Sequence, residues 1–192
     1  MENQKDSPTA EKADKLASET ENIRHLHSEK EGKGYAVEKG IRESKFRKVG
    51  FMDADLATDI EHTREAAEKL EDYSFVIGSR TGEGAKRAFS RQVPSLIFNK
   101  LLKLVFSSDI EDHQCGFKFF NKSEVESVMS KVENKHFFWD AELLVRAQRE
   151  DISVYELEVR WQESGDSNVN VVLDGLKFLK EIIRLKKELV IK

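Results

Sequence analysis

The sequence contains few of the features that would direct a protein out of the cytoplasm or onto a nucleic acid. Its 192 residues include a single cysteine, Cys115, which excludes an internal disulfide framework and fits a reducing compartment. No apolar run approaches the roughly 20 residues that cross a bilayer, and the first residues lack a signal-peptide core. Charged residues make up 35%, but the net charge is only -4, so no excess of positive charge indicates a nucleic-acid partner. We therefore expect one domain that is cytoplasmic or peripheral on a membrane.

Residues 1–22 differ in composition from the rest of the chain. They are polar and densely charged, with Leu16 and a few alanines as their apolar content. A segment with so little apolar content does not build a core, so residues 1–22 predict a disordered polar tail, in part helical, and residues 23–192 predict the domain. Residues 23–27 predict a first short strand.

An acidic pair, Asp53 and Asp55, follows the short apolar segment 49–52, which predicts a buried strand. Two carboxylates one residue apart at the end of a strand offer the hard oxygen ligands that Mg²⁺ or Mn²⁺ takes together with a phosphate group. Thr58 and Glu61 fit a capping box at the start of the next helix, so we assign them to that helix and not to the metal site.

Two cationic groups are candidates for contacts with a phosphate. Lys33 stands between Gly32 and Gly34 before a predicted helix, where the amides and the lysine would cradle a phosphate; a solvated lysine in a tight turn explains the same residues equally well. Arg80 follows a second apolar strand, residues 74–77, and lies at the same sheet edge as the acidic pair if the strands run parallel. There it would either pair with a carboxylate or grip a diphosphate in a bidentate manner.

The segment 81–91 predicts a basic loop, which is either an ordinary solvated loop or one that binds a phosphorylated acceptor. Its cations are Lys86, Arg87 and Arg91. Residues 93–106 then predict a helix that is apolar around most of its circumference, with Ser95, Asn99 and Lys103 as a narrow polar stripe. Such a helix is either buried core or lies among lipid headgroups with its lysines on phosphates.

Residues 109–120 predict a polar turn that leads into an aromatic strand. Asp112, His113 and Gln114 in the turn are candidate ligands. Cys115 is expected to pack as a small side chain, since nothing nearby indicates a lowered thiol pKa. A zinc site is not expected, because one cysteine and scattered histidines lack a ligand spacing.

Two further helices carry residues that bear on function or packing. A helix from residue 137 has Asp140 and Glu142 in its first turn, where acidic residues either complement the helix dipole or belong to a site. The last helix is expected mostly to pack against the domain. Its predicted packing face consists of Val172, Leu176, Leu179 and Ile183.

Several of these stretches, in this order and spacing, resemble family 2 glycosyltransferases, specifically the dolichyl-phosphate mannose and glucose synthases and most closely their archaeal members. The resemblance covers about residues 23–172. Its motifs lie at residues 32–34, 51–58, 78–80, 112–118, 138–143 and 159–161. It implies an α/β fold of the GT-A type, a Rossmann-like mixed sheet flanked by helices. The family's first strand-helix units, which hold the nucleobase and ribose, are not found before residue 23, so the implied GT-A domain is incomplete.

The resemblance also implies roles for the candidate residues. Those implied in catalysis are Asp53, Asp55, Arg80, Asp140 and Glu142. Within this set, the acidic pair would bind Mg²⁺ or Mn²⁺ on the diphosphate of a nucleotide-sugar donor, and the last two residues would orient the sugar or the acceptor. Those implied in contacts with the donor phosphates are Lys33, Gly34 and Arg80. Those implied in contacts with the acceptor phosphate are Lys86, Arg87, Arg91, Gln114 and Lys118.

The implied activity is an inverting, metal-dependent transfer of a hexose to dolichyl or another polyprenyl phosphate in protein glycosylation, at the cytoplasmic face of a membrane. A second chain that supplies the N-terminal half is an implied partner. The alternative is a catalytically inactive remnant or partner subunit that binds a membrane or a complete homologue. A phosphatase with Asp53 as nucleophile and Asp55 as acid fits less well, because the haloacid-dehalogenase pattern has threonine or valine where Ala57 stands.

Overall fold

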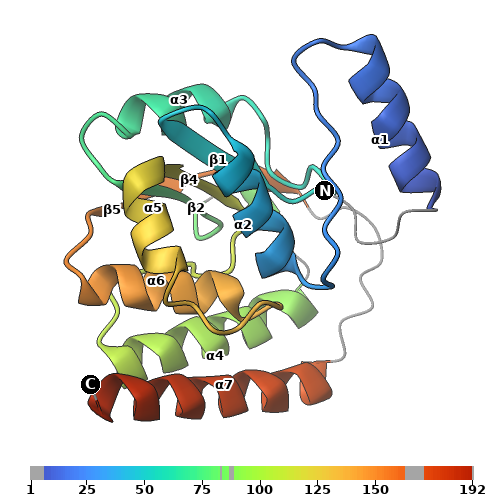
Figure 1. Cartoon of the computed structure of the whole chain (residues 1–192). Helices are drawn as coiled ribbons and strands as arrows, with labels where there is room; N and C mark the ends of the chain where they lie inside the picture. Colours follow the sequence, from blue (N-terminus) through green and yellow to red (C-terminus); the bar gives the residue numbers. More distant parts are fainter. Residues whose placement is uncertain (1–6, 83, 87–88, 163–170, 192) are drawn as a thin grey trace.

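A mixed β-sheet with helices on both faces forms the centre of the protein (Figure 1). The computed structural model describes residues 7–82, 84–86, 89–162 and 171–191. The sheet has four strands in the order β1-β4-β2-β5. These strands are β1 (Lys48–Met52), β2 (Phe75–Ser79), β4 (Phe117–Asn121) and β5 (Val154–Glu158). The predicted α/β class with a mixed sheet flanked by helices is confirmed.

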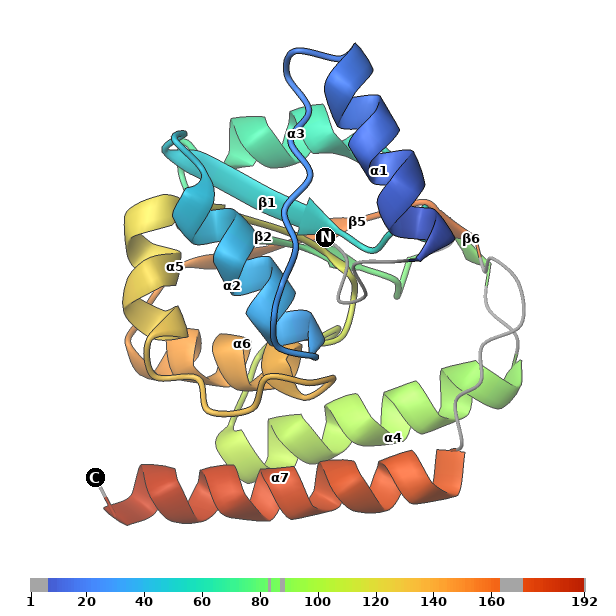
Figure 2. The same ribbon diagram turned by 45° about the vertical axis from the view of Figure 1, so that its right-hand side comes forward.

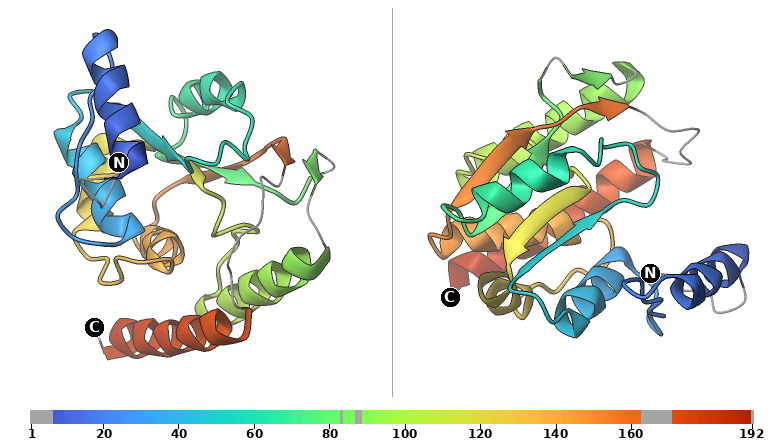
Figure 3. Two further views of the ribbon diagram at one scale, coloured as in Figure 1. Left: turned by 90° about the vertical axis from the view of Figure 1, so that its right-hand side faces the viewer. Right: turned by 90° about the horizontal axis from the view of Figure 1, so that it is seen from above.

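The helices form layers above and below this sheet. Helix α3 covers one face, helices α2, α5 and α6 cover the other, and α4 and α7 lie side by side beyond α6 (Figures 1 and 3). The helices are α1 (Pro8–Glu19), α2 (Lys33–Glu43), α3 (His62–Lys69), α4 (Phe89–Phe106), α5 (Lys122–Met129), α6 (Trp139–Arg149) and α7 (Val171–Ile191). A second, two-stranded sheet pairs β3 (Ala85–Lys86) with β6 (Trp161–Gln162) in parallel.

The strand directions decide where the candidate residues lie. Strand β4 is antiparallel to both β1 and β2, so these two strands point the same way although they are not neighbours. Strand β5 is parallel to β2. Asp53 after β1 and Arg80 after β2 therefore leave the sheet at the same edge, as the sequence predicts.

Alternating side chains of the sheet build two apolar layers, as the period of two in a strand requires. Phe75 and Ile77 of β2 join Val49 and Phe120 in the layer beneath α2, α5 and α6. Val76, between them, turns to the other face and packs with the residues of α3. A third cluster joins α4, α6 and α7. The long helices are thus attached to the domain through α6.

The N-terminal segment agrees with its prediction in part. It is partly helical as expected, since residues 8–19 are helix α1, which Ser7 caps with a 3.1 Å hydrogen bond from the Ala10 amide and Pro8 opens in its first turn. Residues 23–26 are not a strand. They run alongside α2 (Figure 2), to which Arg24 donates a hydrogen bond at the Glu43 carbonyl.

The capping box predicted at Thr58 is also wrong. Helix α3 begins at His62, four residues later, and Thr58 instead forms an isolated β-bridge with Trp161. The Asp59 carboxylate accepts a hydrogen bond from the Glu61 amide and pairs with an arginine of the facing segment. A contact distant in sequence therefore fixes this turn, and local capping does not.

The two long helices pack through residues that the sequence patterns do not indicate. In α7 the predicted face consists of Val172, Leu176, Leu179 and Ile183. The last three are exposed, and the side chain of the first lies outside the part of the chain that the structure describes. The helix packs through Ile182 and Leu185 instead. In α4 the polar Ser95 and Asn99 point inward while Leu96 and Leu104 are exposed. Within the described residues, no helix is long and apolar enough to cross a membrane.

Candidate active site

Asp53 is held at the sheet edge by the segment that precedes β4. Its backbone amide donates a 2.7 Å hydrogen bond to the Gly116 carbonyl, and its carboxylate lies against the same glycine. A β-carbon at position 116 would come within 1.8 Å of Asp53 Oδ2. Position 116 therefore requires glycine if the carboxylate of Asp53 is to occupy its place.

Asp55 lies in the turn that follows. Its Oδ1 accepts a 3.1 Å hydrogen bond from the Ala57 amide, which closes an Asx turn, while the residue between them, Leu56, adopts a positive φ of 54°. Both Asp53 and Asp55 are exposed, Asp53 with 48% of its side chain accessible. They line a pocket of about 350 Å³ together with Gln114 and Phe137, which brings the predicted metal ligands and one predicted acceptor ligand together.

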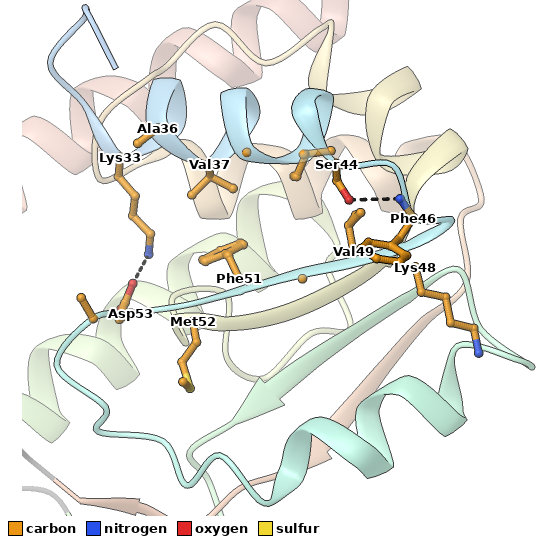
Figure 4. A pocket seen from close by; sticks show the side chains of 14 residues that line it. Lys33, Ala36, Val37, Ser44, Phe46, Lys48, Val49, Phe51, Met52 and Asp53 are labelled. Carbon is orange, nitrogen blue, oxygen red and sulfur yellow. Dashed lines mark hydrogen bonds and ion pairs between the residues drawn. The ribbon is translucent and has the colours of Figure 1, made fainter. Parts of the chain in front are cut away.

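Lys33 reaches the acidic pair from the start of α2 (Figure 4). Its ammonium lies 3.0 Å from Asp53 Oδ1 and 2.8 Å from Asp140 Oδ2. Burial alone would lower the pKa of Lys33, but the carboxylates of Asp140 and Asp53 outweigh burial and raise it. Lys33 thus carries a fixed positive charge at the place where a donor diphosphate is expected.

Gly34 does not have the predicted role of a phosphate cradle. Its amide already donates a 2.9 Å hydrogen bond to the Lys135 carbonyl, and a β-carbon on it would meet the Trp139 ring at 2.4 Å. Gly32 adopts a φ of 139°, which favours glycine. The two glycines are explained by the close packing of α2 against residues 135–139, and a phosphate contact of Lys33 stays a prediction.

Asp140 is buried between two lysines. Its Oδ1 lies 3.0 Å from the ammonium of Lys118, and its Oδ2 contacts Lys33. Burial would raise the pKa of Asp140, but Lys118 and Lys33 lower it below its ordinary value. Lys118 itself is 0% exposed and also donates to the Cys115 carbonyl at 2.5 Å. The prediction that Lys118 contacts the acceptor phosphate therefore conflicts with its burial, and its charge serves to hold Asp140.

Arg80 pairs with Asp112 in a bidentate manner. The distances are 2.6 Å from Nε to Oδ2 and 2.7 Å from Nη2 to Oδ1, and the Arg80 amide donates to the same carboxylate at 3.0 Å. Burial would raise the pKa of Asp112, but the hydrogen bonds and charge of Arg80 lower it to about 2. Of the two roles open from the sequence, the structure shows the ion-pair partner.

Glu142 is occupied in a structural network. It is 0% exposed, and its two oxygens accept the amides of Glu133 and Asn134 at 3.0 and 3.1 Å. Arg146 and Arg184 pair with the same carboxylate, which ties α6 to α7. A substrate cannot reach Glu142 without breaking these contacts, so its burial argues against the predicted role in orienting the sugar or the acceptor.

The predicted basic loop is partly regular structure. Lys86 belongs to β3, where its backbone pairs with Gln162, and Arg91 lies in the first turns of α4. Arg87 lies outside the described residues. Phe137, with 77% of its surface exposed beside the acidic pair, is absent from the predicted site. Its sequence neighbours Phe138 and Trp139 are buried, so no local pattern distinguishes it from core.

The carboxylate oxygens of Asp53 and Asp55 are of the type that a divalent cation binds. Among the described residues no group of three or more His, Cys, Asp and Glu side chains is arranged to hold a metal ion. Mg²⁺, however, is commonly held by one or two carboxylates while substrate phosphates and waters complete its shell. Asp53 and Asp55 at the mouth of an open pocket fit that pattern, and Asp55 Oδ1 is committed to only one amide.

Comparison with known proteins points to one family. The model of the family described as glycosyl transferase family 2 matches residues 3–128, which include α1. Glycosyltransferase AglD of Haloferax volcanii is 41% identical over 184 residues, which are 93% of this chain and 30% of AglD. A dolichyl-phosphate beta-glucosyltransferase of Dictyostelium discoideum is 30% identical over 176 residues, which are 86% of this chain and 54% of that protein.

A solved structure shares the fold. Glucosyl-3-phosphoglycerate synthase from Mycobacterium tuberculosis, in complex with Mn²⁺, uridine diphosphate and glucosyl-3-phosphoglycerate, matches with a TM-score of 0.68 at 14% identity. The match covers 95% of this chain and 64% of that one. The chain thus spans about half the length of the Dictyostelium relative and less than a third of the length of AglD.

Proposed function

Because the chain belongs to glycosyl transferase family 2 and has the GT-A fold of the glucosyl-3-phosphoglycerate synthase, we propose that it is the catalytic part of a dolichyl-phosphate hexosyltransferase. The reaction moves a hexose from a nucleotide sugar to dolichyl or another polyprenyl phosphate. The observation that carries this proposal is the exposed pair Asp53 and Asp55, with the ammonium of Lys33 beside it, at the rim of one pocket. Relatives named for glucosyl transfer to dolichyl phosphate support the acceptor and favour glucose as the hexose.

The donor side of the reaction uses the acidic pair and Lys33. Asp53 and Asp55 would hold Mg²⁺ or Mn²⁺, which when bound neutralises the charge that develops on the leaving diphosphate. The Mn²⁺ and uridine diphosphate named for the solved relative support this assignment. Lys33 adds a fixed positive charge to the same place. A half-buried, already oriented cation stabilises developing negative charge without reorganisation during the reaction.

The acceptor side needs no catalytic base from the chain. A phosphate monoester loses its second proton near pH ~6, so a lipid phosphate is already an anionic nucleophile in neutral water. Asp140 is ionised but buried between Lys33 and Lys118, and it therefore orients Lys33 and does not take a proton from the acceptor. An inverting displacement by the lipid phosphate on the face of the sugar opposite the diphosphate follows from these groups.

The outer face of α4 and α7 suits a membrane surface. These two helices pack against each other (Figures 1 and 2). The exposed residues of this outer face are Leu96, Ile97, Lys100, Leu104, Leu176, Leu179, Lys180, Ile183, Lys187 and Val190. Apolar side chains with lysines beside them are typical of helices that lie in anionic headgroups. A peripheral position at the cytoplasmic face of a membrane brings the lipid acceptor to the site.

The open edge of β1 supports a further polypeptide as partner. Among the strands that the structure describes, β1 ends the sheet, and in its antiparallel ladder with β4 the backbone groups of Lys48, Gly50 and Met52 point outward. A groove of about 570 Å³ runs beside this edge beneath α2 and ends at Lys33 and Asp53 (Figure 4). Unprotected strand edges pair with added strands. We propose that a strand outside residues 1–192, in the same or a second polypeptide, completes the sheet and the donor site.

The test is a transfer assay with the purified chain. It receives nucleotide sugars, Mg²⁺ or Mn²⁺ and dolichyl phosphate, with and without the N-terminal half of a related enzyme. We expect sugar to appear in the lipid fraction only when the added half is present, and Asp55→Ala to abolish the signal. Transfer that survives Asp55→Ala would rule out the metal role.

The second candidate function is an inactive partner subunit, which the same open edge of β1 also favours. Calorimetry with nucleotide diphosphates and Mg²⁺ separates the two functions. If millimolar nucleotide diphosphate does not bind to the chain together with the added N-terminal half, the inactive partner is favoured. Binding that requires Asp53 and Asp55 supports the transferase.

A further inference from the structure

Residues 112–116 link helix α4 to the acidic pair, and we propose that His113 is a positioning residue that transmits the seating of α4 on a lipid surface to Asp53. This inference rests on the proposed membrane contact of α4. It adds a coupling between the lipid side and the donor side of the site. The evidence is a continuous path of short contacts, which begins on α4 at Asn99 and ends at Asp53.

The first part of the path is a buried pair between the two elements. Asn99 points inward from α4, and its Oδ1 accepts both the backbone amide of His113 at 3.1 Å and the ring Nδ1 at 3.0 Å. On the other side of the ring, Nε2 lies 2.8 Å from the hydroxyl of Ser108, which also contacts the side-chain amide of Gln148 on α6. The imidazole is therefore clamped between α4 and α6.

The ring of His113 is neutral in this setting. It is 0% exposed, and burial together with the nearby charge of Lys118 lowers its pKa to about 3. A neutral ring has one donor and one acceptor, so Nδ1–H donates to Asn99, while Nε2 faces the Ser108 hydroxyl, whose proton is directed to Gln148 Oε1. The two hydrogen bonds to Asn99 hold both the ring and the backbone of His113 against α4.

The second part of the path runs along the backbone to the acidic pair. The residues on either side of His113 reach the site directly, Asp112 through its bidentate pair with Arg80 and Gln114 by lining the pocket. Two residues after Gln114, the Gly116 carbonyl accepts a hydrogen bond from the amide of Asp53. Glu156 of β5 fixes the beginning of the segment by accepting the amides of Glu111 and Asp112. A shift of α4 therefore cannot leave residues 112–116 unmoved.

The inward position of Asn99 supports coupling over simple packing. A core contact between α4 and this segment needs only apolar side chains, and the sequence supplies many. Next to the buried apolar residues of α4, its inner side also has an amide whose oxygen holds two N–H groups of one residue, while Leu96 and Leu104 face outward. The helix thus has an apolar outer side for lipid and a directional inner contact with the site.

The test is hydrogen exchange of the full chain with and without vesicles of phosphatidylcholine and phosphatidylglycerol in equal parts. In the wild type we expect vesicles to slow exchange about tenfold at the amides of residues 112–116 and of Asp53, the size of effect that one or two buried hydrogen bonds give. In Asn99→Leu this vesicle-dependent protection should vanish, although the variant still binds vesicles. A merely structural role of Asn99 would change exchange equally with and without vesicles.

Ser95→Ala is the matched control, because Ser95 lies one turn earlier on the same buried side of α4 and its hydroxyl is without a hydrogen-bond partner among the described residues. It should keep the vesicle-dependent protection. If Asn99→Leu fails to fold by circular dichroism, Asn99→Ala replaces it. Vesicle binding without protection at residues 112–116 would overturn the coupling alone. Absence of vesicle binding would overturn the membrane contact and the coupling with it.

Discussion

The carboxylate of Asp53 occupies the space beside Gly116 in which any other residue would have its β-carbon. The distance from that β-carbon to Asp53 Oδ2 would be 1.8 Å, far inside van der Waals contact. The two residues lie on neighbouring antiparallel strand ends and are joined by the hydrogen bond from the Asp53 amide to the Gly116 carbonyl. The position of Asp53, a candidate metal ligand, therefore depends on the absence of a side chain at Gly116.

Gly116→Ala should therefore displace Asp53 and impair the donor site. A misplacement of about 1 Å at a reacting centre costs about a hundredfold in rate, and we expect a loss of that size in transfer by the completed enzyme and in affinity for a nucleotide diphosphate with Mg²⁺. Gly175→Ala is the matched control, since a β-carbon there meets nothing within 4 Å. Equal activity of the two variants would contradict the placement of Asp53.

Asp140→Asn should destabilise the protein, because it leaves the buried charge of Lys118 without its counterion. Removing one partner of a buried ion pair costs about 3–5 kcal/mol in the free energy of unfolding. The double variant Asp140→Asn with Lys118→Met should recover a large part of that loss, which urea unfolding will measure. Glu68→Gln, which removes only an exposed pair with Arg64, serves as control and should change stability by less than about 1 kcal/mol.

Glu142→Gln separates a structural role from a catalytic one. The change removes the buried charge beside Arg146 and Arg184, both of which keep Glu188 as a counterion, so we expect the free energy of unfolding to fall by about 2 kcal/mol. Donor affinity, measured by calorimetry below the unfolding transition, should stay within about twofold of the wild type, a difference of about 0.4 kcal/mol. A loss of donor affinity at unchanged stability would restore Glu142 to the site.

His113 should make the folded protein less stable in mild acid. Its pKa is lowered by burial from 6.5 to about 3, so below pH ~6.5 the unfolded chain binds a proton that the folded chain does not. The free energy of unfolding should then fall by up to about 1.4 kcal/mol per unit as the pH drops from about 6.5 towards 3, with no effect of this group above that range. Urea unfolding of the wild type and of His113→Gln will show the difference as a flatter slope in the variant.

Leu104→Glu should weaken the binding of the chain to anionic vesicles. Leu104 is 81% exposed on the outer face of α4 and α7, and exchanging a leucine for a charge there should lower the partition coefficient about tenfold or more. Phe46→Ser is the control, because Phe46 is equally exposed but lines the groove beside β1. A matching loss in both variants would indicate non-specific adhesion, and sedimentation with vesicles measures the two side by side.

The parts of the fold that sequence reasoning predicts correctly depend on local patterns. The apolar segments that end at Asp53 and Arg80 are strands, and both leave the sheet at one edge as their alternation with helices implies. The α/β class follows from the same patterns, whereas the pairing of Asp53 with Lys33 is not among the predictions. The correctly predicted features need only the period of two in a strand and the alternation of strands with helices.

The parts that are predicted wrongly depend on contacts distant in sequence. In α7 two sides of the helix are apolar, so periodicity alone cannot tell that Ile182 is buried and Ile183 exposed. The glycines around Lys33 serve the packing of Trp139, more than a hundred positions further on, and not a phosphate. Thr58 does not cap helix α3, because its backbone forms a β-bridge with Trp161. Each outcome is decided by a partner that no window of neighbouring residues contains.

The exposed apolar residues of α4 have a practical use in protein engineering. The helix is held on its inner side by the hydrogen bonds of Asn99. Leu96, Ile97 and Leu104 are exposed, so the fold does not depend on apolar side chains at these three positions. Replacing them with glutamine or serine should give a chain that can be handled without detergent at the concentrations needed for crystals or spectroscopy. Deleting the helix to the same end would remove Asn99 and with it the support of the turn beside Asp53.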